Sequence, residues 1–109
     1  MSSAAFTITL DAAENAHGTI AVSGEIDVTN AADFITSVDG VSGRRPLIVD
    51  LSGLRYLDSA GFAAVFHMLD KLAIVVVVDP RSPVRPAATL VGLPCHDSID
   101  AALVSQQAS

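Results

Sequence analysis

The chain has 109 residues, half of them apolar, and carries six Lys and Arg against twelve Asp and Glu, for a formal net charge of −6. This length supports one small hydrophobic core, which predicts a single domain over residues 1–109. The negative charge argues against nucleic acid or an anionic membrane surface as a partner, and the lone Cys95 excludes an intrachain disulfide and a cysteine-based metal site.

The first part of the chain predicts a hairpin followed by a helix. Residues 6–10 alternate apolar and polar side chains, and residues 19–26 form a second β-rich run after a turn that contains Gly and Asn. Thr29 or Asn30 can cap a helix that extends to Val38. These two strands are expected to pair in antiparallel fashion.

The middle of the chain predicts a strand, a helix and a second strand. Residues 47–51 form a buried-looking strand, and a short connection leads to a helix over 59–71. The continuous β-branched run at 74–78 is typical of an interior strand that is covered on both faces. The apolar stripe of the helix, at helical spacing, comprises Phe62, Val65, Phe66, Leu69 and Leu72.

The segment after the third strand predicts a third helix. Ser82 is placed to cap it, and Pro83 suits its first helical position. Pro86 would then lie one turn inside and remove a backbone donor, so this helix is expected to be short or distorted. A brief strand is expected near residues 95–96.

A last helix, capped by Asp97 or Ser98, is expected before a polar tail at 105–109 that frays. The predicted order is therefore β-β-α-β-α-β-α-(β)-α. This order is typical of an α/β fold in which about four helices pack on a mixed sheet of four to five strands.

Asp58 and Ser59 occupy the most informative position, because they stand where the 59–71 helix begins. A side-chain oxygen there can cap the free N–H groups of the first turn, a contribution of about 1 kcal/mol. The same helix end also tolerates added negative charge. A phosphoserine at Ser59 would add about two negative charges beside Asp58 and repel an acidic or apolar partner surface. Capping and a phosphorylation switch are compatible, so both hypotheses stay open.

Three further residues share the direction of Ser59 on a helical wheel. Ala63, Phe66 and Asp70 follow it at helical spacing, and this small residue, aromatic and acid would form a docking edge beside the hydroxyl. Alternatively, Phe66 belongs to the core stripe. Asp27 ends the second predicted strand and matters for this edge only if the fold brings it close to Asp58.

Catalytic chemistry is not predicted. A hydrolase nucleophile elbow requires Gly-x-Ser-x-Gly, but Leu57 replaces the first glycine before Ser59. His17, His67 and His96 show no pairing at metal-ligand spacing. We therefore expect no enzyme activity, no catalytic residue and no metal or cofactor.

Five segments in this order carry a resemblance that covers nearly the whole chain. They are residues 24–27 (Gly-Glu-Ile-Asp), 48–52, 56–61 (Tyr-Leu-Asp-Ser-Ala-Gly), 78–84 and 90–93. Together they resemble the STAS domain, and within it the stand-alone bacterial anti-sigma factor antagonists. The segment 56–61 looks like the phosphorylation motif of that family, with Ser59 at the position of its serine.

The resemblance implies a partner switch in transcription regulation. Such a protein, when unmodified, binds an anti-sigma factor that is also a serine kinase, and thereby frees a sigma factor. The kinase phosphorylates the serine matched by Ser59, which abolishes binding, and a phosphatase restores it. ATP belongs to the kinase, so the chain itself would need no cofactor. Asp27 and Asp58 match acids beside that serine, which implies that both help to recognise the partner.

A rival hypothesis keeps the same fold but changes the function. The chain would then be a STAS-type interaction module for another protein or a small ligand, with Ser59 only a helix N-cap. Either hypothesis fits a cytoplasmic protein, because the N-terminus lacks the pattern of a secretory signal. The longest apolar run, at 72–78, is also too short to cross a bilayer.

Overall fold

The chain folds into four strands and four helices, as seen in a computed structural model that describes residues 4–11, 18–41 and 46–107. The elements in chain order are β1 (Phe6–Asp11), β2 (Thr19–Ile26), α1 (Ala31–Val41), β3 (Leu47–Leu57), α2 (Ser59–Lys71), β4 (Ile74–Val77), α3 (Arg85–Leu90) and α4 (Ile99–Gln107). This order confirms the predicted α/β class.

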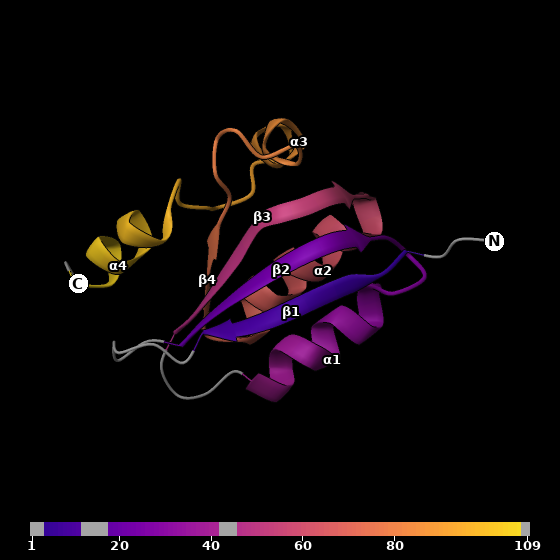
Figure 1. The fold of residues 1–109 in the computed structure, drawn as a ribbon, viewed down its shortest axis with the longest axis horizontal. Coiled ribbons are helices and arrows are strands. Elements are labelled where there is room, and N and C mark those ends of the chain that lie inside the picture. Colours follow the sequence, from indigo (N-terminus) through magenta and orange to yellow (C-terminus); the bar gives the residue numbers. More distant parts are fainter. Residues whose placement is uncertain (1–3, 12–17, 42–45, 108–109) are drawn as a thin grey trace.

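The four strands form one mixed sheet in the order β1-β2-β3-β4. β1 pairs with β2 in antiparallel fashion, as predicted for the hairpin, while β2, β3 and β4 run parallel. Figure 1 shows α1 and α2 together on one face of the sheet, with α4 beside β4 at the far end from α1. Each parallel connection therefore returns through a helix, and α1 and α2 both begin where strands β2 and β3 end.

The hydrophobic core lies mainly between the sheet and helices α1 and α2. Phe34 of α1 and Val65 of α2 are buried there against Val49 and Val76 of the sheet. A second, smaller cluster on the opposite side joins Ile48, Val77 and Ala102, the last from α4. Successive residues of β3 and β4 thus contribute to different clusters, which confirms the prediction that the β-branched run is covered on both faces.

β3 is longer than predicted. The sequence predicts a strand over 47–51, but β3 continues to Leu57 because it remains paired with β2 as far as Ile26. Two shifts in the β2–β3 register interrupt the alternation of buried and exposed positions. Leu54 is buried out of phase with Leu51, and the second shift brings Leu57 back into phase. Strict alternation of apolar and polar residues therefore predicts the end of β3 at residue 51, whereas the strand continues to Leu57.

The predicted start of the third helix was wrong by two residues. α3 begins at Arg85 rather than at Pro83, and the preceding turn is closed by Arg85 N–H donating to the Ser82 carbonyl at 3.0 Å. Pro86 consequently lies in the first turn of α3, where a missing backbone donor breaks no helical hydrogen bond. The helix is short, as predicted, but Pro86 is at a tolerated position.

The C-terminal segment after α3 differs from the sequence prediction in its expected strand and in its expected tail. A single bridge between Val77 and His96 takes the place of the brief strand expected near 95–96. Ser98 caps α4, because its Oγ accepts from the Ala101 N–H at 3.0 Å. α4 continues to Gln107, so the prediction of a frayed tail was wrong for residues 105–107 and lies outside the described residues for 108–109. Similarly, α1 extends to Val41 instead of ending at Val38.

Candidate functional site

Asp27 and Asp58 come together where β2 and β3 end. Ile26 of β2 pairs with Leu57 of β3, so each aspartate directly follows a paired residue. In addition, the Asp58 N–H donates to the Ile26 carbonyl at 3.3 Å. The fold therefore brings Asp27 to the start of α2, close to Asp58. This proximity is the condition under which the sequence analysis expected Asp27 to contribute to the docking edge. We call this place, with Ser59 and Gly61, the switch edge.

The N-cap of α2 is Asp58. Its backbone is extended (φ −89°, ψ −174°), and its Oδ1 accepts from the Gly61 N–H at 2.9 Å. The Asp58 carbonyl accepts from the Phe62 N–H at 2.9 Å. The assignment of the N-cap to Ser59 is therefore wrong, because the carboxylate one residue earlier already satisfies the helix end.

Ser59 is the first residue of α2, and it is exposed. Its hydroxyl forms no hydrogen bond to any described residue. An exposed hydroxyl without an internal partner is accessible to another protein, and its replacement removes no contact that the described chain uses. The position is thus free for a modification at the positive end of the helix dipole.

Gly61 allows α2 to approach the ends of the strands. A Cβ atom at this position would lie 2.2 Å from Leu57 Cδ1 and 3.2 Å from the Ile26 carbonyl oxygen. Both Leu57 and Gly61 are buried, so the leucine methyl has little room to move. The glycine of the Asp-Ser-Ala-Gly segment is therefore a packing requirement that seats the first turn of α2 against β2 and β3.

A buried asparagine holds the loop between β2 and α1. The Asn30 side chain is 8% exposed; its Oδ1 accepts from the Asp27 N–H at 2.9 Å, and its Nδ2 donates to the Glu25 carbonyl at 3.0 Å. The Thr29 N–H and hydroxyl both donate to Asp27 Oδ1. The sequence predicted Asn30 only as a possible cap of α1. It did not predict the function of Asn30 in the loop, because these bonds join the side chain to earlier residues at the end of β2 and not to the helix that follows.

The exposed face of α2 carries the residues predicted to form a docking edge. Ser59, Ala63 and Phe66 are all exposed, with Phe66 at 38%. The alternative that Phe66 belongs to the core stripe is therefore wrong. Met68, which is fully buried, belongs to the core instead.

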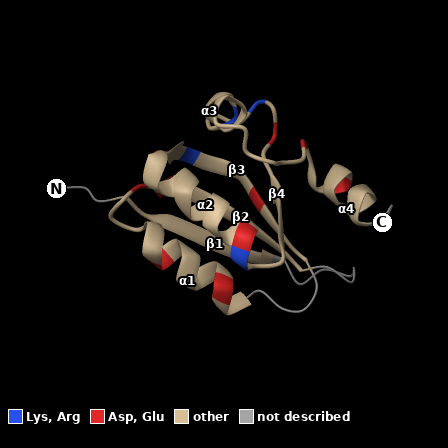
Figure 2. Cartoon of the chain, turned by 180° about the vertical axis from the view of Figure 1, so that it is seen from behind, with Lys and Arg blue, Asp and Glu red and all other residues tan. Residues whose placement is uncertain are grey.

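Most of the surface of α2 carries no charged side chain. Figure 2 shows charge on α2 only at its C-terminal end, where Asp70 and Lys71 form an exposed ion pair of 3.4 Å. Near the other end, Arg55 of β3 binds the Glu25 carboxylate. The surface that starts at Ser59 and continues along α2 is therefore uncharged over most of its length.

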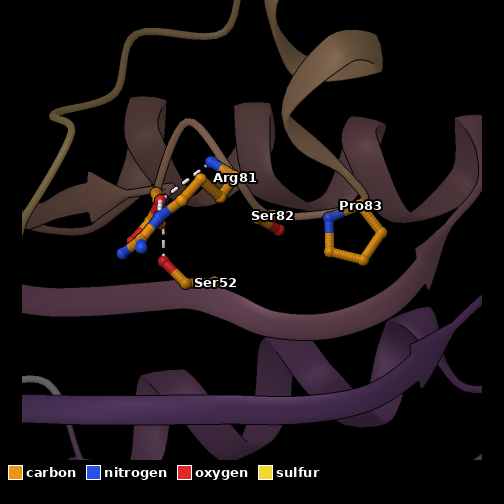
Figure 3. Close-up of a pocket in the computed structure, with 5 residues that line it drawn as sticks. Ser52, Arg81, Ser82 and Pro83 are labelled. Carbon is orange, nitrogen blue, oxygen red and sulfur yellow. Dashed lines mark hydrogen bonds and ion pairs between the residues drawn. The ribbon is translucent and has the colours of Figure 1, made fainter.

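A second group of polar residues lies after β4, and we call residues 79–85 the β4 turn. A hollow of about 330 Å³ is lined by Ser52, Asp79, Arg81, Ser82 and Pro83 (Figure 3). Ser52 Oγ accepts from the Asp79 N–H at 2.8 Å, and the Asp79 carboxylate accepts from the Arg81 N–H and guanidinium. These hydrogen bonds from Arg81 hold the pKa of Asp79 below its usual value.

Arg85 extends this network. Its Nη1 donates to the Val78 carbonyl at 2.7 Å and to Asp97 Oδ1 at 2.8 Å. The guanidinium thus connects the end of β4, the start of α3 and the segment that leads to α4. The polar groups of the β4 turn are mostly engaged with one another, which is typical of a structural connection.

The two described histidines, His67 and His96, do not assemble a metal site, and neither forms a hydrogen bond with the Ser59 hydroxyl. His67 lies on the exposed surface of α2, and His96 is tied to β4 through its backbone. His17 lies outside the described residues. Within the ranges that the structure describes, no three His, Cys, Asp or Glu side chains form a group that could hold a metal ion, and no helix is long and apolar enough to cross a bilayer.

Comparison with known proteins places these features in a family context. A family model described as "Mlab, STAS domain" matches residues 9–94. The fold is also similar to the crystal structure of an anti-sigma factor antagonist from Mycobacterium paratuberculosis, with a TM-score of 0.76 and 27% identity. That similarity covers 93% of each chain.

A second solved structure shares the fold at lower similarity. It is an antisigma-factor antagonist, STAS domain, from Rhodobacter sphaeroides, with a TM-score of 0.53 and 16% identity. The match covers 65% of the present chain and 82% of the other. At this identity the likeness concerns the architecture alone. The family match begins within β1 and includes the elements from β2 to α3, with the switch edge at the ends of β2 and β3.

Proposed function

The chain belongs to the STAS domain family, and from this premise we propose that it acts as an anti-sigma factor antagonist that is switched at Ser59. In the unmodified form it binds an anti-sigma factor that is also a serine kinase, and a sigma factor is thereby freed. Phosphorylation of Ser59 by that kinase ends the binding. Such a circuit would operate in the cytoplasm, where a phosphatase returns the chain to its binding form.

This proposal rests on one observation: Asp58 and Ser59 have different roles at the start of α2. Asp58 caps α2 through the Gly61 N–H, while the Ser59 hydroxyl is exposed and unbonded among the described residues. Phosphorylation would therefore change the charge of the surface and leave the helix cap in place. The similarity to the mycobacterial anti-sigma factor antagonist along 93% of both chains supports the same function.

The chemistry of the switch belongs to the partner. The kinase transfers the γ-phosphoryl group of ATP to Ser59 Oγ: the Oγ–P bond forms, the bond from the γ-phosphorus to the bridging oxygen breaks and ADP leaves. The hydroxyl proton passes to a general base of the kinase. The chain contributes an accessible nucleophile and a surface that the kinase recognises. Asp27 and Asp58 each use Oδ1 inside the molecule, and we assign recognition of the partner to the remaining oxygen, Oδ2, of each carboxylate.

Release follows from the added charge. A phosphoserine brings about two negative charges to an edge that already holds two carboxylates. An apolar or acidic partner surface above this edge would have to strip water from the phosphate, which costs several kcal/mol when no cation compensates. The binding free energy of the complex would fall accordingly.

The test combines phosphorylation and binding. The chain is incubated with ATP and each candidate anti-sigma kinase of its genome, and phosphate is located by mass spectrometry. We expect modification of Ser59, binding of Ser59→Ala that ATP does not reverse, and weak binding of Ser59→Glu. Ser105→Ala, an exposed serine on α4, serves as the matched control and should behave as the wild type.

Two results would overturn the proposal. One is the absence of phosphate on Ser59 with every kinase that binds the chain. The other is equal affinity of the wild type, Ser59→Ala and Ser59→Glu for such a partner. The second result would favour an interaction module in which Ser59 has no switching function.

A further inference from the structure

An apolar groove separates the exposed sides of α1 and α2, next to the switch edge. It has a volume of about 430 Å³. The lining residues are Val28, Ala31, Ala32, Ile35, Ala60, Ala63, Ala64 and His67. The small side chains of alanine on both helices leave the space between them open, and Ala60 directly follows Ser59 in the chain. The groove is therefore continuous with the surface assigned to the switch.

Val28 stands at the rim of this groove and is 76% exposed. The loop that contains Val28 is held in place. The Asn30 side chain binds the Asp27 N–H and the Glu25 carbonyl, and the Thr29 N–H binds the Asp27 carboxylate. An exposed aliphatic side chain costs little conformational entropy on binding when its backbone is already fixed. Such a residue beside an apolar hollow is typical of a protein contact surface.

The charge distribution limits what can occupy the groove. No Asp, Glu, Lys or Arg lines it, and charge on α2 lies at the distal end (Figure 2). Among the lining side chains, His67 alone could offer a polar group to a polar metabolite or an anion. The lining thus complements an uncharged, apolar group, whereas Asp27 and Asp58 lie at the end next to Ser59.

We propose that this groove receives an aliphatic or aromatic side chain that the anti-sigma factor inserts between α1 and α2, with Val28 packing against it. The inference rests on the proposed function and names the contact that the phosphate disturbs. A phosphorylated Ser59 directly precedes the lining residue Ala60, so the inserted segment would cover a dianion together with an apolar surface. The loss of hydration of that dianion opposes insertion and explains why charge at Ser59 releases the partner.

The test blocks the groove without touching Ser59. Ala63→Leu fills the space with a strong helix former, and Val28→Asp places a charge at the rim. The matched controls are Ala101→Leu and Val104→Asp, both at exposed positions of α4. Affinity for the anti-sigma kinase that phosphorylates the wild-type chain is measured without ATP by calorimetry, and phosphorylation of Ser59 is followed at saturating kinase.

We expect each groove variant to bind about tenfold more weakly or worse, as for a central apolar contact, while both controls bind as the wild type. Ser59 should still be phosphorylated in the groove variants when kinase saturates. Normal affinity of both Ala63→Leu and Val28→Asp would overturn the inference and leave the proposed function intact. Absence of any kinase that binds the chain would overturn both.

One competing occupant is a second copy of this chain. Sedimentation of the wild type and of Ala63→Leu over a range of concentrations decides this case. A dimer that Ala63→Leu abolishes would assign the groove to self-association and overturn the inference. A monomer in both proteins, together with weakened kinase binding of the variant, supports it.

Discussion

The switch edge and the β4 turn both follow the ends of parallel strands, and both contain Asp and Ser. They differ in how the polar groups are used. In the β4 turn, the Asp79 N–H donates to Ser52 Oγ of β3, and the Asp79 carboxylate accepts from the Arg81 guanidinium. At the switch edge, Asp58 satisfies the helix end, and the Ser59 hydroxyl next to it has no bond within the described residues.

This difference separates a structural connection from a candidate site. Polar groups that bind one another hold a turn in shape but present little to a partner. A hydroxyl that is exposed at a helix N-terminus, beside an apolar groove, presents both a nucleophile and a contact surface. Composition alone does not distinguish the two regions, since both contain Asp and Ser. The hydrogen bonds of each region make the distinction.

The largest expected effect concerns Gly61, which seats α2 at the switch edge. Gly61→Val should lower the free energy of unfolding by about 1–3 kcal/mol, because its Cβ meets Leu57 and the Ile26 carbonyl. Urea denaturation measures the change. Gly40→Ala is the matched control: a Cβ there meets nothing within 4 Å, and it should stabilise α1 by about 0.5–1 kcal/mol. Equal stability of both variants would contradict the packing argument.

The next effect concerns Asn30, which ties the β2–α1 loop to the switch edge. Asn30→Ala leaves the Asp27 N–H and the Glu25 carbonyl without their side-chain partner, which should cost about 1–3 kcal/mol. Thr36→Ala is the control, because the Thr36 hydroxyl only bonds back to the Ala32 carbonyl on an exposed helix face. An Asn30→Ala protein as stable as the control would mean that the loop is held by other contacts.

Local patterns in the sequence identified much of the switch edge. Asp58 and Ser59 before an apolar-periodic helix mark a helix start, and the shared direction of Ser59, Ala63 and Phe66 on α2 follows from the helical repeat alone. The choice of Asp58 over Ser59 as the cap did not follow, because both residue types cap helices well.

Other features depend on pairing between distant segments. The extension of β3 to Leu57 requires the shifted register with β2, which no local alternation reveals. The exposure of Phe66 depends on where α2 settles on the sheet, and its stripe position gave the opposite expectation. The bonds of Asn30 to Asp27 and Glu25 exist only once the loop has folded back on the end of β2.

A smaller effect distinguishes Asp58 from Ser59 directly. Asp58→Ala removes the cap of α2 and should cost about 1 kcal/mol, and Asp58→Asn, which can still accept from the Gly61 N–H, should restore most of the loss. Ser59→Ala should change stability by less than about 0.5 kcal/mol. Thermal or urea unfolding measures the three variants. If Ser59→Ala lowered the free energy of unfolding as much as Asp58→Ala does, Ser59 and not Asp58 alone would cap α2.

The smallest effect concerns the β4 turn and depends on pH. Hydrogen bonds from Arg81 keep the pKa of Asp79 in the folded chain below its usual value near 4. As the pH falls, the unfolded chain therefore takes up this proton first. The contribution of Asp79 is fully present above its ordinary pKa and is lost as the pH falls through the lower, folded value.

The measurement is the free energy of unfolding at pH 6 and pH 3 for the wild type, Asp79→Asn and Ser52→Ala. Asp79→Asn should differ from the wild type mainly at pH 6, and 1 M salt should reduce the difference because the Asp79–Arg81 pair is exposed. Ser52→Ala removes an acceptor of the Asp79 N–H, so its loss should persist at both pH values. If Asp79→Asn shows the same deficit at pH 3 as at pH 6, the carboxylate charge does not hold this turn. The contrast with the switch edge would then rest on hydrogen bonds to neutral groups alone.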